Sequence, residues 1–282
     1  MNKNLLQLYS LKWNPFSPEI PIDAVWTPPA SHNFLWRIEH VLAREGGFAL
    51  LTGDPGTGKS VTLRLLEQRL QRVPDLQVAA LIHPSGTLAD FYRELAELFA
   101  VDLKPHNRWA GFKTLRVRWL AHLANTLLRP VLLIDEAQES SAVVLNELRL
   151  MASAEFDSKS LLSVVLAGDH RLTDLLRRDD LLPLGSRIRV RLNIEHASRD
   201  QLLACLEHLL HTAGNPRLFA PAVQTALVDH AIGNYRVLCN LAAELLAAAA
   251  QRNLESIDEA LFFELFTPRQ PTPQRRRTVT TG

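Results

Sequence analysis

Long uncharged hydrophobic runs are missing from this sequence of 282 residues. No such run approaches the ~18 residues that span a bilayer, and the first residues contain no apolar core of signal-peptide length. Even the most apolar stretch, residues 241–250, is interrupted by Glu244. We therefore expect a cytoplasmic protein without a membrane-embedded part.

Cysteine and excess charge are also scarce. The two cysteines, Cys205 and Cys239, lie in stretches with helical periodicity and outside any CxxC or Cys/His cluster. This pattern favours buried free thiols in a reducing compartment over a disulfide or a metal site. The formal net charge of +1 gives no information about a nucleic-acid partner, because a basic patch can be balanced by acidic surface elsewhere.

Short apolar runs alternate with helix-length stretches over the first two thirds of the chain. After a proline-rich lead, residues 33–45 carry a helical pattern. Alternation of this kind predicts right-handed crossovers and a parallel sheet with helices on both faces. Five runs are expected to form the strands: 47–52, 77–82, 131–135, 162–167 and 188–192.

From about residue 198 the pattern is helical only, with further helices expected at 220–232, 235–252 and 256–266. The last residues contain three prolines, four arginines and no acid, a composition typical of a disordered basic tail. We divide the chain accordingly into a lead segment with a first helix (1–45), an α/β core (46–195), a small helical domain (196–266) and the tail (267–282).

A glycine-rich loop follows the first predicted strand. Residues 53–60 read GDPGTGKS and match GxxxxGK[ST] without a mismatch, with a helical pattern directly after them. Backbone N–H groups of such a loop converge on phosphates, and the helix start adds the positive end of its dipole. We expect Lys59 to neutralise the β and γ phosphates of ATP and Ser60 to hold Mg²⁺. The predicted nucleotide-binding residues are Gly53, Asp54, Pro55, Gly56, Thr57, Gly58, Lys59, Ser60 and Val61.

Two acids, Asp135 and Glu136, end the predicted strand that begins at Val131. At the carboxyl end of a buried strand they would lie beside the phosphate loop. We predict that Asp135 coordinates Mg²⁺, directly or through water, and that Glu136 orients and deprotonates the attacking water. Such a pair is a weak signal alone, and its specificity comes from the loop earlier in the same chain.

Three further positions are candidates for sensing the nucleotide. Asp169 or its neighbour His170 follows the fourth strand and could face the γ-phosphate, with an ordinary loop position as the alternative. Arg187, just before the last strand, is interpreted as an arginine finger acting in the site of the next subunit, against a plain surface arginine. Arg236 begins a helix from which it could reach back to the nucleotide, or it is merely solvated.

Taken in chain order, the motifs resemble those of the AAA+ ATPases of the ExeA group: GDPGTGKS at 53, LLIDEAQ at 132, VLAGDHRL at 165, LGSRI at 184 and GNYR at 233. Residues 11–16 and His32 also resemble that group's lead segment, and the resemblance spans roughly residues 9–265. It implies a P-loop AAA+ core with a parallel five-stranded sheet, followed by a small all-helical lid domain.

The family roles carry over onto Lys59, Ser60, Asp135, Glu136, Arg187 and Arg236. The first-sensor position does not carry over cleanly, because Asp169 stands where a neutral polar residue is commoner. An altered trigger and slow hydrolysis are the expected consequences.

The ExeA group implies two different functions. One is a secretion ATPase in which a membrane helix and a cell-wall-binding domain follow the ATPase. The other is a transposition regulator similar to TniB, TnsC and IstB. Because the sequence ends soon after the lid, we expect the second: an ATP-dependent homo-oligomer, ring or filament, that assembles on double-stranded DNA and recruits a transposase, with a target-selection protein as a further partner. A secretion or envelope-assembly ATPase and a helicase-loader or initiator-type ATPase remain alternatives.

The stretch between residues 103 and 134 contains no acid. Its basic residues could follow a phosphate backbone, with an affinity that falls steeply as salt rises. Candidate DNA contacts are Lys104, Arg108, Lys113, Arg116 and Arg118.

Aromatic residues are interleaved with these charges. Trp109, Phe112 and Trp119 fall on one helical face with Leu123, which favours a position in the core over base stacking. The tail arginines 275–277 are a second candidate for contacting DNA or a partner protein, with a solubilising tail as the alternative.

Overall fold

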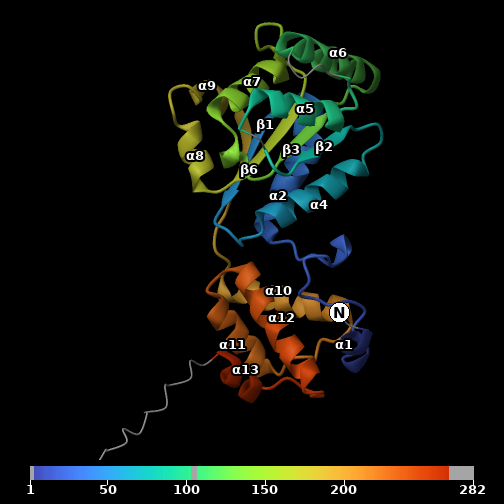
Figure 1. Ribbon diagram of the computed structural model, residues 1–282, viewed down its shortest axis with the longest axis vertical. Coiled ribbons are helices and arrows are strands. Elements are labelled where there is room, and N and C mark those ends of the chain that lie inside the picture. Colours follow the sequence, from blue (N-terminus) through green and yellow to red (C-terminus); the bar gives the residue numbers. More distant parts are fainter. Residues whose placement is uncertain (1–2, 85, 103–106, 267–282) are drawn as a thin grey trace, which may run out of the picture.

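The computed structural model describes residues 3–84, 86–102 and 107–266, and consists of an α/β part and a helical part (Figure 1). The α/β part is built on a parallel five-stranded sheet in the order β2-β3-β6-β1-β7. The strands are β1 (Gly47–Gly53), β2 (Val78–Leu81), β3 (Val131–Ile134), β6 (Ser163–Gly168) and β7 (Ile188–Ile194). These are the five predicted runs, so the prediction of a parallel five-stranded sheet is confirmed.

Burial explains why the strands could be predicted from the sequence. Every residue of β3 and β6 is buried, as expected for inner strands covered on both faces. At the edge of the sheet, β7 alternates instead: Ile188 and Val190 are buried, whereas Arg189 and Arg191 are exposed. The period-two pattern therefore appears only where one face of a strand meets solvent.

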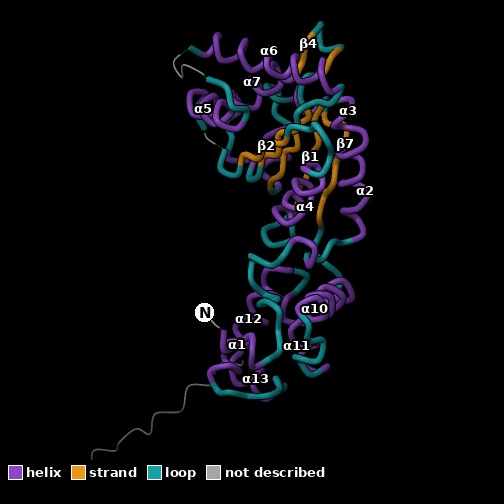
Figure 2. Tube along the Cα trace, turned by 90° about the vertical axis from the view of Figure 1, so that its right-hand side faces the viewer, coloured by secondary structure: helices purple, strands orange, loops and turns teal. Residues whose placement is uncertain are grey.

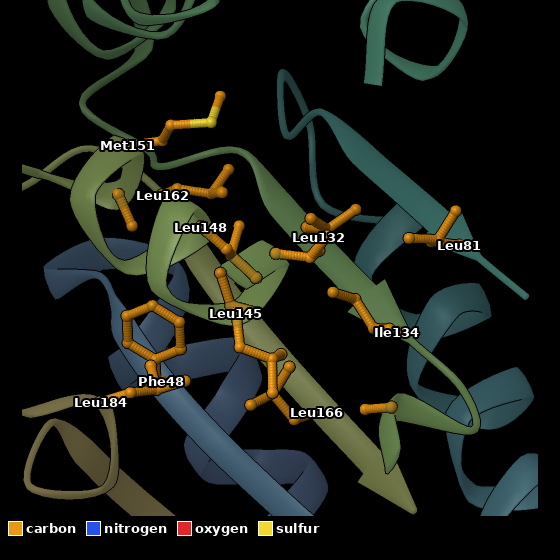
Figure 3. Packing of buried hydrophobic residues seen from close by; sticks show 14 of the residues in the cluster. Phe48, Leu81, Leu132, Ile134, Leu145, Leu148, Met151, Leu162, Leu166 and Leu184 are labelled. Atoms are coloured by element: carbon orange, nitrogen blue, oxygen red, sulfur yellow. The ribbon is translucent and has the colours of Figure 1, made fainter. Parts of the chain in front are cut away.

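Helices cover both faces of this sheet. One face carries α5 (Leu88–Leu98), α6 (Arg108–Thr126), α7 (Ala142–Ala152), α8 (His170–Leu176) and α9 (Leu182–Gly185). The other carries α2 (Pro29–Arg37), the π-helical η2 (Ile38–Leu42), α3 (Ala43–Glu45) and α4 (Lys59–Gln71). Figure 3 shows the first face, where α7 packs on β3 and β6 through Leu145, Leu148, Leu132, Ile134 and Leu166.

Three short elements complete the α/β part: the 3-10 turns η1 (Ile22–Ala24) and η3 (Ala137–Glu139), and an antiparallel hairpin of β4 (Ser153–Ala154) and β5 (Lys159–Ser160). The sequence pattern did not predict this hairpin, because two-residue strands are too short to show a period. Its turn holds three consecutive non-glycine residues at positive φ, Glu155, Phe156 and Asp157.

The helical part contains α10 (Arg199–Ala213), α11 (Pro221–Ala231), α12 (Tyr235–Gln251) and α13 (Glu259–Phe266) around a hydrophobic cluster of its own. The start of the chain joins this cluster: α1 (Lys3–Leu8) lies beside α12 (Figure 2). Tyr9 donates its hydroxyl proton to the Leu254 carbonyl (2.9 Å), and Lys12 N–H donates to the Ala213 carbonyl (2.8 Å). The chain thus packs into the helical part before it crosses to the sheet. The residue ranges given to the four parts stay predictions.

Both cysteines are free, Cys205 buried and Cys239 half-buried. Burial raises the pKa of the Cys205 thiol well above its usual range and that of Cys239 to about 11. Within residues 3–266, apart from the gaps named above, no group of three or more His, Cys, Asp or Glu side chains is arranged to hold a metal ion. None of the helices in that part of the chain has the length and apolarity to cross a membrane.

Candidate nucleotide-binding site

The glycine-rich loop joins β1 to α4 and has a backbone that its glycines require. Gly56 and Gly58 have φ of +84° and +106°, in the left-handed region that favours glycine. At Gly53, an added Cβ would lie 2.5 Å from the Ile194 carbonyl oxygen of the neighbouring strand. Apart from Gly58 and its two chain neighbours, none of the described residues has a heavy atom within 4 Å of a Cβ built at Gly58, so the loop is open where it enters the helix.

Lys59 is the most constrained side chain of the loop. It is buried, and its Nζ donates to the carbonyls of Gly53 (2.8 Å) and Asp54 (3.1 Å). These carbonyls are neutral dipoles, and among the described residues no carboxylate forms an ion pair with the ammonium, which favours an anion in the loop. Thr57 closes the loop by donating from Oγ1 to the Asp54 carbonyl (2.8 Å). Ser60 is exposed in the first turn of α4, as is the next residue, Val61.

The two acids lie at the same edge of the sheet as the loop. Ile134, which precedes them, pairs with Leu166 of β6, and Leu166 pairs in turn with Leu50 of β1. Two strand spacings, about 10 Å, therefore separate the end of β3 from Leu50, and the loop begins three residues further along β1, at Gly53. Asp135 is half-buried and its Oδ1 accepts the N–H of Glu136 (3.0 Å). Glu136 is exposed and has φ of +48°.

Asp169 is used in the local structure. Its carboxylate caps α8 by accepting the Arg171 N–H (2.9 Å) and also pairs with the Arg171 guanidinium (2.9 Å). The Asp169 carboxylate thus caps the helix and shares the Arg171 guanidinium with Glu139. The assignment of Asp169 as a sensor stays a prediction, and its function as a helix cap is evident from these contacts.

The helical part contacts the loop directly at the start of α12. Asn234 caps this helix by accepting the Arg236 N–H (3.0 Å), and Arg236 itself is exposed. An added Cβ at Gly56 would lie 2.3 Å from Asn234 Oδ1, so the loop glycine permits this close approach. Among the described residues, three hydrogen bonds join this side of the molecule to the loop itself: Asn234 Nδ2 to the Pro55 carbonyl (2.9 Å), Arg236 N–H to the Gly56 carbonyl (3.3 Å), and His196 Nε2 with Asp54 Oδ2 (3.1 Å).

A cavity of about 390 Å³ lies beside the loop. Its walls come from the loop and α4, from the helical part and from the proline-rich lead: Thr57, Gly58, Val61, Tyr235, Arg236, Cys239, Phe16, Ile20, Val25 and Trp26. Arg64 of α4 holds the lead in place by donating to the carbonyls of Pro18 (3.0 Å) and Ile20 (2.7 Å). An apolar cavity that opens onto a phosphate-type loop has the form of a nucleoside site.

Sequence reasoning placed Arg236 near the loop but missed Asn234, His196 and this cavity wall. The signal for Asn234 was present, since an asparagine directly before a helical pattern is a helix cap. Nothing local in the sequence indicates that the lead crosses α4.

Arg187 lies just before the amino end of β7, whereas the loop follows the carboxyl end of the neighbouring strand β1. Phe48 pairs with Ile188, whereas Gly53 pairs with Ile194, so Arg187 is about 20 Å from the loop of its own chain. Its guanidinium pairs with Asp157 in the β4–β5 turn and contacts the Pro183 carbonyl. The structure therefore separates Arg187 from the other candidate residues.

Two of the predicted DNA contacts are engaged inside the protein. Arg108 pairs with Glu147, a carboxylate whose side chain is 3% exposed. The Arg116 guanidinium donates to the carbonyls of Leu150 (3.2 Å) and Met151 (3.1 Å) at the end of α7. Acceptors on α7 thus already use both guanidinium groups, and the assignment of Arg108 and Arg116 as DNA contacts stays a prediction.

The remaining basic residues of α6 are more accessible. Lys113 and Arg118 are exposed, and the Lys113 ammonium lies 4.8 Å from the centre of the Trp109 ring. Trp119 is buried as predicted, but Trp109 is 65% exposed and stacks on Phe112, so its assignment to the core is wrong. Lys104 and the arginines 275–277 lie outside the described residues.

Comparisons with known proteins agree with this arrangement. Residues 42–176 match a family described as an AAA domain. General secretion pathway protein A of Aeromonas hydrophila is 34% identical over 253 residues, covering 87% of this chain and 45% of that protein. The chain thus spans about half the length of this relative.

Solved structures share the fold at low identity. Cdc6p of Pyrobaculum aerophilum has a TM-score of 0.69 at 17% identity, covering 86% of this chain and 67% of that one. The structure of Drosophila ORC bound to DNA has 0.68 at 16%, covering 93% and 65%. Domain III of the replication initiation protein DnaA of Thermotoga maritima has 0.61 at 16%, covering 89% and 96%. At such identities the likeness is one of fold alone.

The sheet order, the loop and the family match define the chain as a P-loop ATPase of the AAA+ class, a class that binds nucleotide together with a divalent metal. Within that class, the similarity to General secretion pathway protein A supports the ExeA group, as the motifs predicted.

Proposed function

We propose that this chain is an ExeA-type ATPase in which ATP and Mg²⁺ control the assembly of identical copies, and that it serves a secretion or envelope-assembly apparatus. The similarity to General secretion pathway protein A over 253 residues carries the choice of apparatus. The contact of α12 with the phosphate-type loop supports control of assembly by nucleotide, because it couples the loop to the helical part.

The chain's own residues have distinct functions in this proposal. Lys59 turns from the loop carbonyls to the β and γ phosphates, while Ser60 and Asp135 hold the metal. Glu136 accepts a proton from the attacking water at the exit of β3. The cavity between the lead and α12 takes the base and ribose, and Arg236 reports the presence of phosphate to the helical part. The bound Mg²⁺ would supply charge neutralisation at the phosphates.

Arg187 acts between copies in this proposal. It is about 20 Å from its own loop, which supports a function in the site of a neighbouring copy. A guanidinium stabilises charge on a transferring phosphoryl group, and in this structure it is satisfied by Asp157. Assembly would exchange that carboxylate for the neighbour's phosphate.

Calorimetry and steady-state hydrolysis test the site. Lys59→Ala should abolish ATP binding, whereas Glu136→Gln should retain it and lose turnover by about 100-fold or more. Glu139→Gln is the matched control, since Glu139 is a nearby exposed acid paired with Arg171. This variant should hydrolyse ATP at the wild-type rate. Absence of any affinity for adenine nucleotides with Mg²⁺ would refute the proposal.

Mixing two inactive variants tests the function of Arg187. Arg187→Ala copies retain Glu136, and Glu136→Gln copies retain Arg187, so a mixed assembly contains complete sites. We expect turnover to recover on mixing and to rise with protein concentration. No recovery, with each variant still binding ATP, would show that Arg187 does not act between copies.

A second candidate is a DNA-bound regulator of transposition that recruits a transposase. The exposed Lys113 and Arg118 support it, because within the described part of the chain they make none of the internal hydrogen bonds made by Arg108 and Arg116. Binding of duplex DNA should then require ATP and weaken as salt rises. Each of Lys113→Ala and Arg118→Ala should reduce the slope of log binding constant against log salt concentration by about one unit. Binding that ignores nucleotide, or none at low salt, would exclude this function.

The genes beside this one separate the two candidates. A neighbouring DDE-type transposase gene favours the regulator, and a membrane-protein gene favours the secretion-type ATPase.

A further inference from the structure

Gln138 connects the carboxylate at the exit of β3 to the exit of β6. It lies in η3, two residues after Glu136, and is half-buried. Its Oε1 accepts the backbone N–H of Asp169 (3.3 Å), and its Nε2 donates to Glu136 Oε2. The two strand ends are thereby joined through one amide side chain.

The orientation of this amide follows from its partners. A backbone N–H can only donate, so the amide oxygen must face Asp169. The NH₂ group then points to Glu136, where a carboxylate can only accept. Within the described part of the chain, Glu136 Oε2 is held in this way while Oε1 accepts no hydrogen bond.

The end of β6 is shaped to receive Gln138. A Cβ added at Gly168 would lie 2.3 Å from Gln138 Oε1 and 2.9 Å from Leu172 Cδ2. The φ of Gly168 lies outside the left-handed region, so the need for glycine here is one of space and not of backbone conformation. Any larger residue would push the amide away from the Asp169 N–H.

We propose that Gln138 is a positioning residue for ATP hydrolysis, which holds one oxygen of Glu136 so that the other faces the attacking water. The proposal rests on the function proposed for Glu136. A base held in one orientation reaches the proton it removes more often than a freely rotating one. Because Gln138 is anchored on the backbone of Asp169, a shift at the end of β6 would also move Glu136.

The expected effect is on kcat and not on binding. Gln138→Ala should lower kcat by about 10-fold, less than Glu136→Gln, because the carboxylate is still present. The dissociation constants of ATP and ADP with Mg²⁺ should not change. Gln71→Ala is the matched control, since Gln71 Nε2 donates to Glu67 Oε1 (3.3 Å) on α4, and it should leave kcat unchanged.

A double-mutant cycle separates positioning from general packing. Gly168→Ala should lower kcat by displacing the amide, and its effect should largely disappear in the Gln138→Ala background. Additive losses would mean that Gly168 acts independently of Gln138. If Gln138→Ala folds poorly, Gln138→Glu keeps the side-chain length, removes the donor and should show the same loss of kcat.

A wild-type or raised kcat for folded Gln138→Ala overturns the proposal, as does a loss that appears equally in nucleotide affinity. The Glu136→Gln variant distinguishes this failure from failure of the proposed function. If Glu136→Gln is inactive and Gln138→Ala is normal, only the positioning of Glu136 by Gln138 is wrong. If Glu136→Gln is also active, Glu136 is not the base.

Discussion

Replacing Arg108 by alanine decides whether the amino end of α6 serves structure or DNA. Arg108 Nε donates to Glu147 Oε1 (2.9 Å), Nη2 contacts Oε2, and the Tyr92 hydroxyl donates to the same Oε1 (2.6 Å). The Glu147 side chain is 3% exposed and that of Arg108 is 60% exposed. Arg108→Ala therefore leaves a buried carboxylate with Tyr92 as its remaining side-chain donor.

The magnitude follows from this burial. Removing one partner of a fully buried ion pair costs about 3–5 kcal/mol. Here Tyr92 stays bound, and the exposed side of Arg108 lets water enter the gap, so we expect about 2 kcal/mol. For a chain of this size that loss lowers the melting temperature by about 5 °C.

The pH dependence gives a second signature. Burial alone would raise the pKa of Glu147, but hydrogen bonds from Arg108 and Tyr92 and the arginine's charge lower it overall. A carboxyl with a lowered pKa stabilises the fold above its unfolded pKa, and this stabilisation is lost as pH falls. In Arg108→Ala the burial remains without the cation, so the pKa should be raised and the carboxyl should destabilise the fold as pH rises. The stability difference between the two proteins is thus largest at neutral pH.

Thermal unfolding at neutral pH and near the unfolded pKa of glutamate, about 4.3, measures both effects. Arg118→Ala is the control, because Arg118 lies exposed on the same helix. It should melt like the wild type at both pH values. The reasoning fails if Arg108→Ala also melts like the wild type and weakens DNA binding as much as Arg118→Ala does.

Two further outcomes concern the site. Asn234→Ala removes a helix cap and a bond to the Pro55 carbonyl, so it should cost about 1 kcal/mol of stability and weaken ATP binding in calorimetry. Unchanged affinity would mean that α12 does not shape the loop. Asp157→Asn removes the carboxylate that pairs with Arg187, so half-maximal ATPase activity should be reached at a lower protein concentration. An unchanged concentration dependence would show that Asp157 does not restrain Arg187.

Those parts of the fold whose signals are local could be predicted from the sequence. β3 and β6 are apolar throughout because both their faces are covered, and the loop glycines are set by backbone geometry within eight residues. The hydrogen bond from Asn234 to the Pro55 carbonyl could not be predicted, because the two residues are 179 positions apart and meet only through the packing of the helical part. The same holds for the lead, which α1 and Tyr9 tie to helices at the other end of the chain.

Charge patterns show the same limit more sharply. Arg108 and Arg118 lie on one helix in one acid-free stretch, and nothing local distinguishes them. The partner of Arg108 is Glu147, 39 residues later on α7, and the two residues meet through the packing of α7 beside α6. A basic run in a sequence therefore gives an upper limit on the charge available to a phosphate backbone. How much of it reaches the surface depends on which acids and carbonyls the folded chain brings to it.

The position of the lead has a mechanical consequence for the cavity beside the loop. The first residues of the lead are fixed to the helical part through Tyr9 and Lys12, and the later residues of the lead are fixed to α4 through Arg64. The cavity wall between these anchors lies across the junction of the two parts. A rotation of the helical part must then move this wall and the Asn234 contact together. Under the proposed function, loss of the phosphates at the loop would therefore also loosen the hold on the base. For this reason we expect the lead, and not the loop alone, to set how tightly the nucleotide is held.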